Sequence, residues 1–449
     1  MQTEYSQGSA PQSLFSISWP IFIDLLLHLS TLVINTLMVK QVSTAYVAAM
    51  GVGNQVFNLN VTVLSFISVG CSVVVAQYLG SGNRDMAVRA IHVAIAFNLF
   101  LGLFSASVVV FFASDILYAL NTPSQLMYHG HLYLFTLGLC LFPEAISLIL
   151  ASCLRVYGYA KTAMYVTLIA NICTVLGNFV ALYGIGGVEP SGLYGVGCST
   201  FIGRLISIIL LLFLFTHGLG MRFHLRFFWQ WGDGILQKIL HIGLPAAGEN
   251  LLWTGQYMTI FAFIGLMGEE ALAAQTLYFL LAHFIMSLGI AVSLGNEILV
   301  GYYVGAKRFD DAYRKTFQSL RVGLFFTILT VVIIWGIKKP LLAVMVGDTE
   351  IVHLLLPLFS ISLLLEPGRT FNIVMVNALR AAGDARFPMF MGIIFMWGVA
   401  VPVAYTLGIV FKMGLVGIWI GFLCDEWLRG LANAWRWKSR KWEGKRLAI

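Results

Sequence analysis

The segment WPIFID at residues 19–24 has a counterpart, LPAAGE, at residues 244–249, which lies 225 positions further along the chain. The same spacing aligns LRVYGYA at 154–160 with LRAAGDA at 379–385, and no gap is needed between the two matches. The matched positions include proline, glycine, acidic residues and arginine, so they are not a chance agreement of apolar residues. The second half of the chain therefore repeats the first, a pattern typical of transporters built from two related lobes.

The composition predicts a membrane protein. The chain is 59% hydrophobic and 10% charged, whereas a soluble domain carries about 25% charged residues. Its apolar stretches are long enough to cross a bilayer as helices and too uniform for the alternating strands of a barrel. We therefore predict an all-α polytopic membrane protein with twelve transmembrane helices in two six-helix lobes. The predicted spans are 14–38, 45–78, 90–113, 128–150, 161–184, 193–217, 239–268, 271–302, 317–337, 353–377, 387–411 and 413–435.

The distribution of basic residues predicts the orientation. With both termini in the cytoplasm, twenty lysines and arginines lie in cytoplasmic loops and the tail, against four (Lys40, Lys338, Lys339, Lys412) outside. This asymmetry follows the positive-inside rule and indicates a multi-pass protein of the inner (plasma) membrane. Six spans per half is an even number, so the repeat is parallel. The predicted parts are an N-terminal tail (1–13), an N-lobe (14–217), a cytoplasmic linker (218–238), a C-lobe (239–435) and a basic tail (436–449).

Two carboxylates occupy equivalent positions in the first span of each half. Asp24 and Glu249 each follow a proline by four residues, about one helical turn. Ionisable groups inside a membrane are costly and often mark ion pathways. We expect Asp24 and Glu249 to face each other near mid-membrane and to couple transport to H⁺ or Na⁺. The alternative is that a neighbouring polar group holds each acid and the pair only ties helices together.

A second charged motif, EPGRTFN at 366–372, lies in the tenth predicted span. Glu366 and Arg369 are three residues apart and share a helix face. Arginine keeps its charge, so it needs an acidic partner in lipid. Glu144 is the repeat equivalent of Arg369, and a contact between Glu144 and Arg369 is the alternative to the local pair. This motif is either a structural brace or part of the coupling site.

Several uncharged polar residues also lie inside predicted spans. Such residues either join helices or line a cavity. The candidates for a substrate cavity are Asn35, Asn171, Thr174, Asn178, Gln256 and Gln275.

Other function classes are disfavoured by missing motifs. The sequence has no GxxxxGK[ST] nucleotide-binding loop and no Ser/His/Asp or HExxH arrangement. We therefore expect no enzymatic activity, no cofactor and no nucleic-acid partner. The only metal ion expected is Na⁺, at Asp24 or Glu249.

At the level of motifs, the chain resembles the multidrug and toxic compound extrusion (MATE) transporters. The resemblance rests on the turn QYLGSG at 77–82 with its counterpart YYVGA at 302–306, and on the run from Glu366 to Asp384. It implies a bundle that alternates between inward- and outward-open states. It also implies export of amphipathic organic cations, or of flavins in some members, coupled to inward flow of H⁺ or Na⁺.

The sequence departs from the family pattern at two acids. Many members have an aspartate near the outer end of span one and another in span five, where this chain has Asn35 and Asn178. An asparagine cannot carry a proton, which leaves Asp24 as the acid of span one. Two alternatives to multidrug export stay open: a flippase for lipid-linked precursors, which favours a cationic cavity, and a non-transporting scaffold or receptor, which a flux assay would distinguish.

Overall fold

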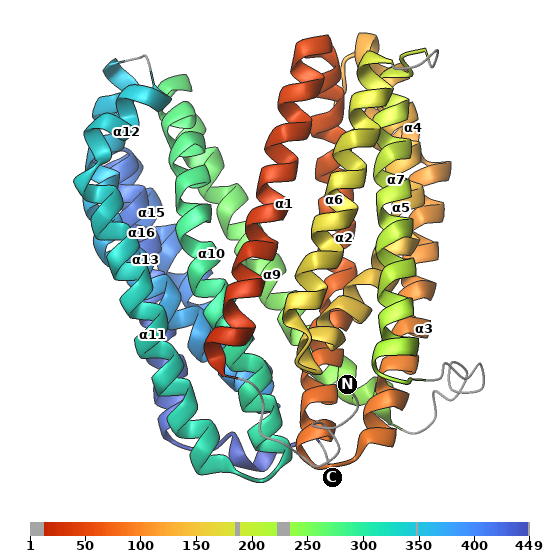
Figure 1. Cartoon of the computed structure of the whole chain (residues 1–449). Coiled ribbons are helices and arrows are strands. Elements are labelled where there is room, and N and C mark those ends of the chain that lie inside the picture. Colours follow the sequence, from red (N-terminus) through yellow and green to blue (C-terminus); the bar gives the residue numbers. More distant parts are fainter. Residues whose placement is uncertain (1–12, 185–188, 222–233, 347–348, 448–449) are drawn as a thin grey trace. The chain divides into compact units, whose positions relative to one another are not determined.

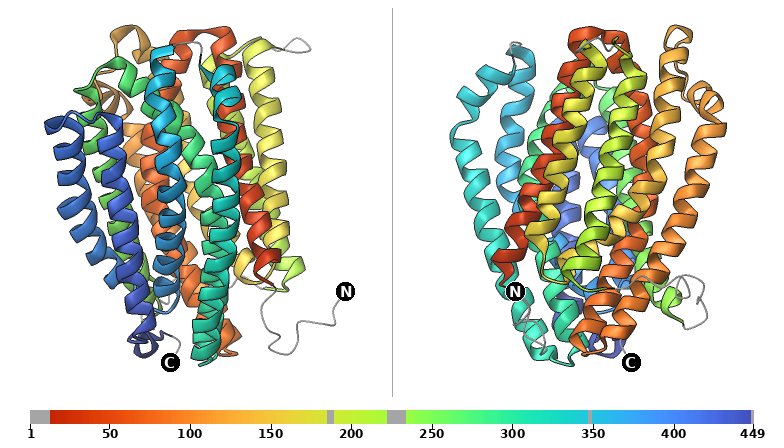
Figure 2. Two further views of the ribbon diagram at one scale, coloured as in Figure 1. Left: turned by 90° about the vertical axis from the view of Figure 1, so that its left-hand side faces the viewer. Right: turned by 45° about the vertical axis from the view of Figure 1, so that its right-hand side comes forward.

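The computed structural model describes residues 13–184, 189–221, 234–346 and 349–447. Every regular element among these residues is a helix, and Figure 1 shows the long helices (Figure 2 gives two further views). The elements are α1 (Leu14–Val42), α2 (Thr44–Gly80), α3 (Arg84–Phe111), α4 (Ala113–Ala119), α5 (Ser124–Val156), α6 (Ala160–Tyr183), α7 (Gly192–Phe213), η1 (Leu214–Gly218), α9 (Ile235–Gly265), α10 (Glu269–Gly305), α11 (Phe309–Gly336), α12 (Lys338–Met345), α13 (Thr349–Ala381), α14 (Arg386–Gly392), η2 (Ile393–Ala400), α15 (Val401–Tyr405), η3 (Thr406–Val410), α16 (Leu415–Lys438) and η4 (Glu443–Lys445).

The helix boundaries reproduce the repeat seen in the sequence. Helices α2, α3 and α5 begin and end 225 residues before α10, α11 and α13, respectively. The short helices α4 and α12 also begin 225 residues apart. The two halves therefore share one plan, including a short helix that the sequence did not predict.

Prolines lie inside several of the long helices. Pro20 in α1 and Pro245 in α9 are at equivalent positions of the repeat. Each removes a backbone donor, which frees a carbonyl in the preceding turn. Around Pro402 the chain is continuously helical but winds as π-helix on both sides, in η2 and η3. Such local widening is a common response to a break in the hydrogen-bond ladder.

Ten helices of the described chain are long and apolar enough to cross a membrane. The remaining two of the twelve predicted spans correspond to α9 and α16, which have 31 and 24 residues. Both are long enough, but they carry polar and charged side chains: Glu249 and Gln256 in α9, and Asp425, Glu426 and Arg429 in α16. The two helices that are least apolar therefore hold most of the acids of the site described below.

The chain forms two compact units. The N-terminal unit comprises residues 23–75 and 83–243, and the C-terminal unit comprises the described chain up to Phe22, residues 76–82 and the chain from Leu244 onward. In the N-terminal unit the apolar core lies among α2, α3, α5 and α7. In the C-terminal unit two cores follow α10, α13 and α16, and one includes Trp437 and Trp442, which are fully buried. Most of the predicted linker, residues 222–233, lies outside the described residues.

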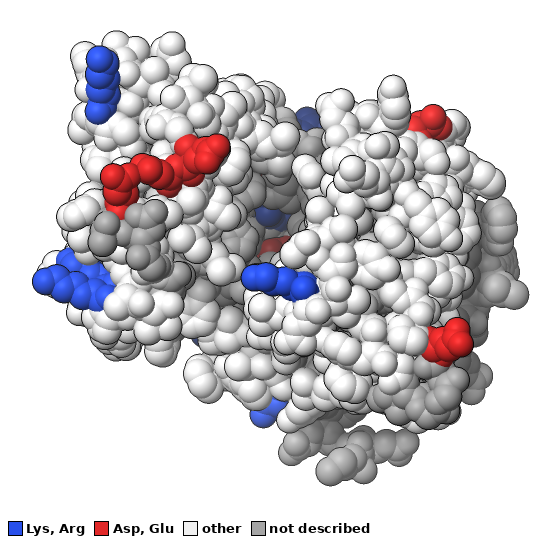
Figure 3. Space-filling view, turned by 90° about the horizontal axis from the view of Figure 1, so that it is seen from above, with Lys and Arg blue, Asp and Glu red and all other residues white. Residues whose placement is uncertain are grey.

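Charged side chains are sparse on the face seen from above in Figure 3. The predicted outer basic residues at the helix ends are Lys40, Lys338 and Lys412, with Lys339 beside Lys338. Several of the twenty residues assigned to cytoplasmic loops lie within helices. Arg155 and Arg380 lie inside α5 and α13 and bind acids of other helices. The membrane orientation itself stays a prediction.

Candidate functional site

The repeated acids each bind a repeated arginine. Arg155 at the end of α5 donates to Asp24 of α1, and Arg380 at the end of α13 donates to Glu249 of α9 over 2.8 Å. Both pairs are separated by 131 residues in the sequence. The sequence predicted two titratable acids facing each other, with a neighbouring polar group holding each acid as the alternative. The structure gives each acid an arginine within its own unit, and the facing arrangement stays a prediction. The repeat match at residues 154–160 and 379–385 marked both arginines as equivalent, but it did not identify them as the partners of the acids.

A chain of hydrogen bonds positions Arg380. The guanidinium donates to Asn377 Oδ1 over 3.1 Å, and Asn377 donates to Ser293 Oγ over 2.6 Å. Ser293 in turn donates to the Ile373 carbonyl oxygen over 3.0 Å. The equivalent serine of the first half, Ser68, likewise donates to the carbonyl oxygen equivalent to that of Ile373. The serine-to-carbonyl hydrogen bond is therefore present at equivalent positions in both halves.

The N-terminal unit holds a small, electrically balanced ion network. Glu144 of α5 lies 3.0 Å from Arg204 of α7, and Asp24 binds Arg155. His28 lies within electrostatic reach of all four side chains. Two carboxylates face two guanidiniums, so this network needs no further charge. Within its own unit the partner of Glu144 is thus Arg204, a contact that the sequence did not suggest.

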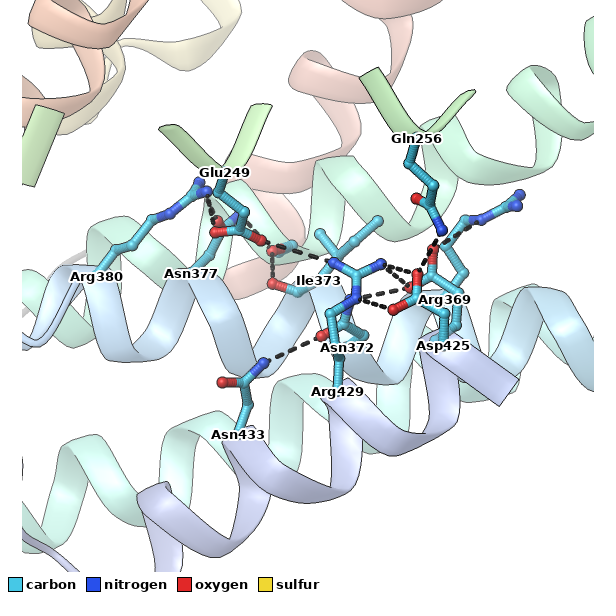
Figure 4. Close-up of polar contacts among 12 residues, drawn as sticks. Glu249, Gln256, Arg369, Asn372, Ile373, Asn377, Arg380, Asp425, Arg429 and Asn433 are labelled. Carbon is cyan, nitrogen blue, oxygen red and sulfur yellow. Dashed lines mark hydrogen bonds and ion pairs between the residues drawn. The ribbon is translucent and has the colours of Figure 1, made fainter. Parts of the chain in front are cut away.

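The C-terminal unit holds a larger network, and Figure 4 shows part of it, around Arg369, Arg380 and Arg429. Arg369 donates to both carboxylate oxygens of Glu366, over 2.8 and 3.1 Å, which is the pair expected from their spacing in α13. Arg429 of α16 donates to both oxygens of Asp425, over 2.6 and 2.8 Å. All four side chains are at most 10% exposed. The Arg429 pair is bidentate, whereas in the Arg369 pair one nitrogen donates to both oxygens, and both pairs are buried.

Glu426 lies between these two arginines. Its carboxylate is 3.5 Å from Arg369 Nε and 3.3 Å from Arg429 Nη2, and it accepts a hydrogen bond from Asn372 over 2.9 Å. Arg429 also approaches Glu249, at 3.8 Å. Through these contacts the ion pairs of α9, α13 and α16 become one network. We refer to its members as the C-terminal ion network: Glu249, Glu366, Arg369, Arg380, Asp425, Glu426 and Arg429.

The C-terminal ion network has more carboxylates than guanidiniums. It contains four carboxylates and three arginines (−4 + 3 = −1), and the arginines stay charged at any accessible pH. Glu297 of α10 is also buried and interacts electrostatically with Arg380, but none of the ion pairs among the described residues includes it, so it is not counted as a member. An isolated buried charge is unfavourable unless a partner compensates it. The network is therefore suited to bind one cation or one proton.

The asparagines predicted to line a cavity connect α6 to α1. Asn178 donates to Asn35 over 2.9 Å, so the two residues that stand in place of the family acids meet directly. Asn171 donates to the Leu27 carbonyl oxygen over 3.4 Å. Thr174 lies between them in sequence but hydrogen-bonds its own helix, at the Ala170 carbonyl oxygen.

The two predicted cavity glutamines are buried in the C-terminal unit. Gln256 is 1% exposed and donates to Asp425 over 3.4 Å, so it belongs to the surroundings of the ion network. Gln275 accepts a hydrogen bond from the Trp419 indole over 2.8 Å. Among the described residues no group of three histidine, cysteine or acidic side chains is arranged to hold a metal ion.

A repeated helical bundle with charged networks inside apolar helices is the architecture of a membrane transporter. A family model described as MatE matches residues 20–180 and 245–406. The two matches begin 225 residues apart (245 − 20), which is the spacing of the internal repeat.

Similar proteins give the same assignment. Over 436 residues the chain is 38% identical to "Uncharacterized transporter YisQ" of Bacillus subtilis (strain 168), covering 97% of this chain and 96% of that protein. It is 25% identical over 421 residues to "Probable multidrug resistance protein NorM" of Thermotoga maritima, covering 91% and 88%. A solved structure described as MATE in the straight conformation superposes with a TM-score of 0.87 at 16% identity, covering 95% of each chain. The chain belongs to the MATE family and is a multi-pass membrane transporter, not an enzyme.

Proposed function

We propose that this transporter exports amphipathic organic compounds by alternating access, driven by inward flow of H⁺ or Na⁺. The observation that carries the proposal is the surplus of carboxylates in the C-terminal ion network. Within a low-dielectric bundle, one uncompensated negative charge favours binding of a cation. A site whose charge depends on a bound cation can differ in free energy between two conformations, which is what coupling requires.

The surplus is concentrated in α13 and α16. Arg380 is matched by Glu249, whereas Arg369 and Arg429 share the three carboxylates of Glu366, Asp425 and Glu426. We therefore propose that the cation binds among these three acids. Asp24 and Glu249, the coupling acids predicted from the sequence, each have an arginine partner, and their coupling role stays a prediction for the same experiment.

The substrate class is proposed from relatives and from charge. Similar proteins are named as probable multidrug resistance proteins. A net negative network favours cationic organic compounds and disfavours the anionic head groups of lipid-linked precursors, so the flippase alternative is the weaker one. We place the protein in the plasma membrane with both termini in the cytoplasm, on the distribution of basic residues.

Transport in proteoliposomes tests the coupling site. One proton moving down about 100 mV and one pH unit supplies roughly 3.7 kcal/mol, enough for ~500-fold accumulation. The parent should accumulate a cationic dye when a pH or Na⁺ gradient is imposed, and flavin nucleotides serve as the second substrate class. Glu366→Gln, Asp425→Asn and Glu426→Gln should each abolish gradient-driven accumulation while the protein still inserts.

Asp24→Asn and Glu249→Gln test the coupling acids predicted from the sequence in the same assay. If only these two variants lose accumulation, the repeated acids form the coupling site and the surplus in α13 and α16 does not. If all five variants accumulate dye as the parent does, neither group of acids couples transport to the cation.

A further inference from the structure

The ends of α2 and α10 approach each other through two equivalent glycines. A Cβ atom on Gly80 would overlap the Tyr302 carbonyl oxygen, and one on Gly305 would overlap the Gln77 carbonyl oxygen. The two contacts are related by the 225-residue repeat. Only glycine permits backbones to come this close. Residues 76–82, the end of α2, belong to the C-terminal unit, although most of α2 belongs to the N-terminal unit.

The chain after α16 folds back onto these helix ends. We refer to residues 439–447 as the C-terminal tail. Leu447 donates its backbone N–H to Gln77 Oε1 over 2.8 Å, and Gln77 Nε2 donates to the Ala381 carbonyl oxygen at the end of α13 over 2.7 Å. Arg446 donates to the Gly305 carbonyl oxygen at the end of α10 over 2.7 Å. The tail and Gln77 thus connect the ends of three helices.

The tail has a defined conformation of its own. The Trp442 ring stacks on Trp437 at 4.1 Å between centroids, and its indole donates to the Trp437 carbonyl oxygen. Both rings are fully buried. Arg440 bonds Asp310, at the start of α11, over 2.6 Å, and this bond raises the pKa of Arg440 above its ordinary value. An indole anchor and an ion pair therefore fix the tail before it reaches Gln77.

We propose that the C-terminal tail is a latch, which holds the end of α2 against the ends of α10 and α13 and must release it during the transport cycle. The proposal rests on the alternating-access cycle proposed above. An α2 end bound by Gln77 to both the tail and α13 cannot separate from α10 without breaking these hydrogen bonds. The tail therefore biases the transporter toward the conformation in which the ends of α2 and α10 are in contact.

Distance measurements between spin labels test the latch. Labels at Ser81→Cys and Ala306→Cys report on the ends of α2 and α10, in a background in which the half-buried Cys173, Cys198 and Cys424 are alanine. The parent should show mainly one short distance. Gln77→Leu, which removes both side-chain hydrogen bonds, and removal of residues 440–449 should each make longer distances predominate.

Lys438→Ala is the matched control, because this exposed lysine ends α16 without belonging to the latch. It should leave the distances unchanged. If the truncated chain does not fold, Gln77→Leu alone decides. Equal distance distributions in the parent and in Gln77→Leu overturn the proposal. The measurement requires neither substrate nor an ion gradient, so its failure is distinguishable from a failure of cation coupling.

Cross-linking tests whether the latch must open. A short bifunctional thiol reagent that joins the cysteines introduced by Ser81→Cys and Ala306→Cys should reduce transport to background. The two variants that carry only one of these substitutions, treated with the same reagent, should transport as the parent does. Transport at the parental rate by the cross-linked protein would show that these helix ends need not separate, and would overturn the proposal.

Discussion

Replacing Arg380 should destabilise the protein more than replacing Glu249, although the two side chains form one ion pair. Arg380 Nη2 lies 2.8 Å from Glu249 Oε2, and the side chains are 11% and 9% exposed. At an effective dielectric constant of about 20, charges at this distance attract by about 6 kcal/mol. Breaking a buried pair by removing one partner costs about 3–5 kcal/mol.

The two variants change the network charge in opposite directions. Arg380→Met takes the C-terminal ion network from −1 to −2 and leaves Glu249 without its nearest cation, so the full loss of about 3–5 kcal/mol is expected. Glu249→Gln brings the network to 0, and the amide oxygen can still accept from Arg380. Its cost should be about 1–2 kcal/mol, the size of one weakened charged hydrogen bond.

The balanced network of the N-terminal unit serves as the internal comparison. There, Asp24→Asn and Arg155→Met each leave one unpaired charge, so the two losses should be similar. Arg155 is 23% exposed, and access to water should make both losses smaller than that of Arg380→Met.

Apparent unfolding temperature in detergent, at one fixed scan rate, is the measurement. Arg386→Met, which removes an exposed arginine just beyond α13, controls for loss of positive charge and should change the temperature little. We expect Arg380→Met to lower it at least twice as much as Glu249→Gln does. Equal decreases, or a larger decrease for Glu249→Gln, would refute the charge count on which the coupling proposal rests.

Three further outcomes follow from the contacts. Glu366→Gln and Arg369→Gln should each lower the yield of monodisperse protein in size-exclusion chromatography, and Arg369→Gln should lower it more. The double variant should recover most of the loss because it adds no unpaired charge. A double variant with a yield as low as that of Arg369→Gln would contradict this. Asn35→Asp combined with Asn178→Asp places two carboxyl groups where the amides now lie 2.9 Å apart. One carboxyl group should therefore stay protonated, and the transport rate should gain a new pH dependence. An unchanged pH profile of transport would show that these positions do not contact the transport path. Gly80→Ala should cost about 1–3 kcal/mol through overpacking, seen as a lower unfolding temperature, and an unchanged temperature would show that α2 and α10 can part freely.

The fold could be predicted from the sequence because its signals are local and redundant. Long apolar runs specify helices, and the 225-residue repeat fixes which helices correspond. Among the described helices, the predicted spans missed α4 and α12, since seven or eight residues at the end of an apolar run have no periodicity of their own, and the single turn η4 near the C-terminus. The hydropathy of α9 and α16 is lower than that of the other long helices because their charged and polar side chains lower it even where those side chains bind each other inside the protein.

The site was harder to predict because its partners are far apart in the chain. The pair of Glu366 and Arg369 lies within one helix turn and could be read from spacing. The partners of Asp24 and Glu249 are 131 residues away, near a helix end where arginine is normally a loop residue. Their match in the repeat indicated importance, but it could not indicate contact.

The difference between the halves explains where a coupling charge can reside. At one pair of equivalent positions the N-terminal half has Glu144 and the C-terminal half has Arg369, and each is near an arginine, Arg204 or Arg429. A glutamate and an arginine neutralise each other, whereas two arginines need acids from other positions to neutralise their charges. The C-terminal half supplies three, Glu366, Asp425 and Glu426, where the N-terminal half has Leu141, Thr200 and Phe201. Two acids would have balanced the two arginines, and the third makes the network negative. The surplus therefore lies at positions where the repeat has diverged, while the acids that both halves share are matched by arginines that both halves share.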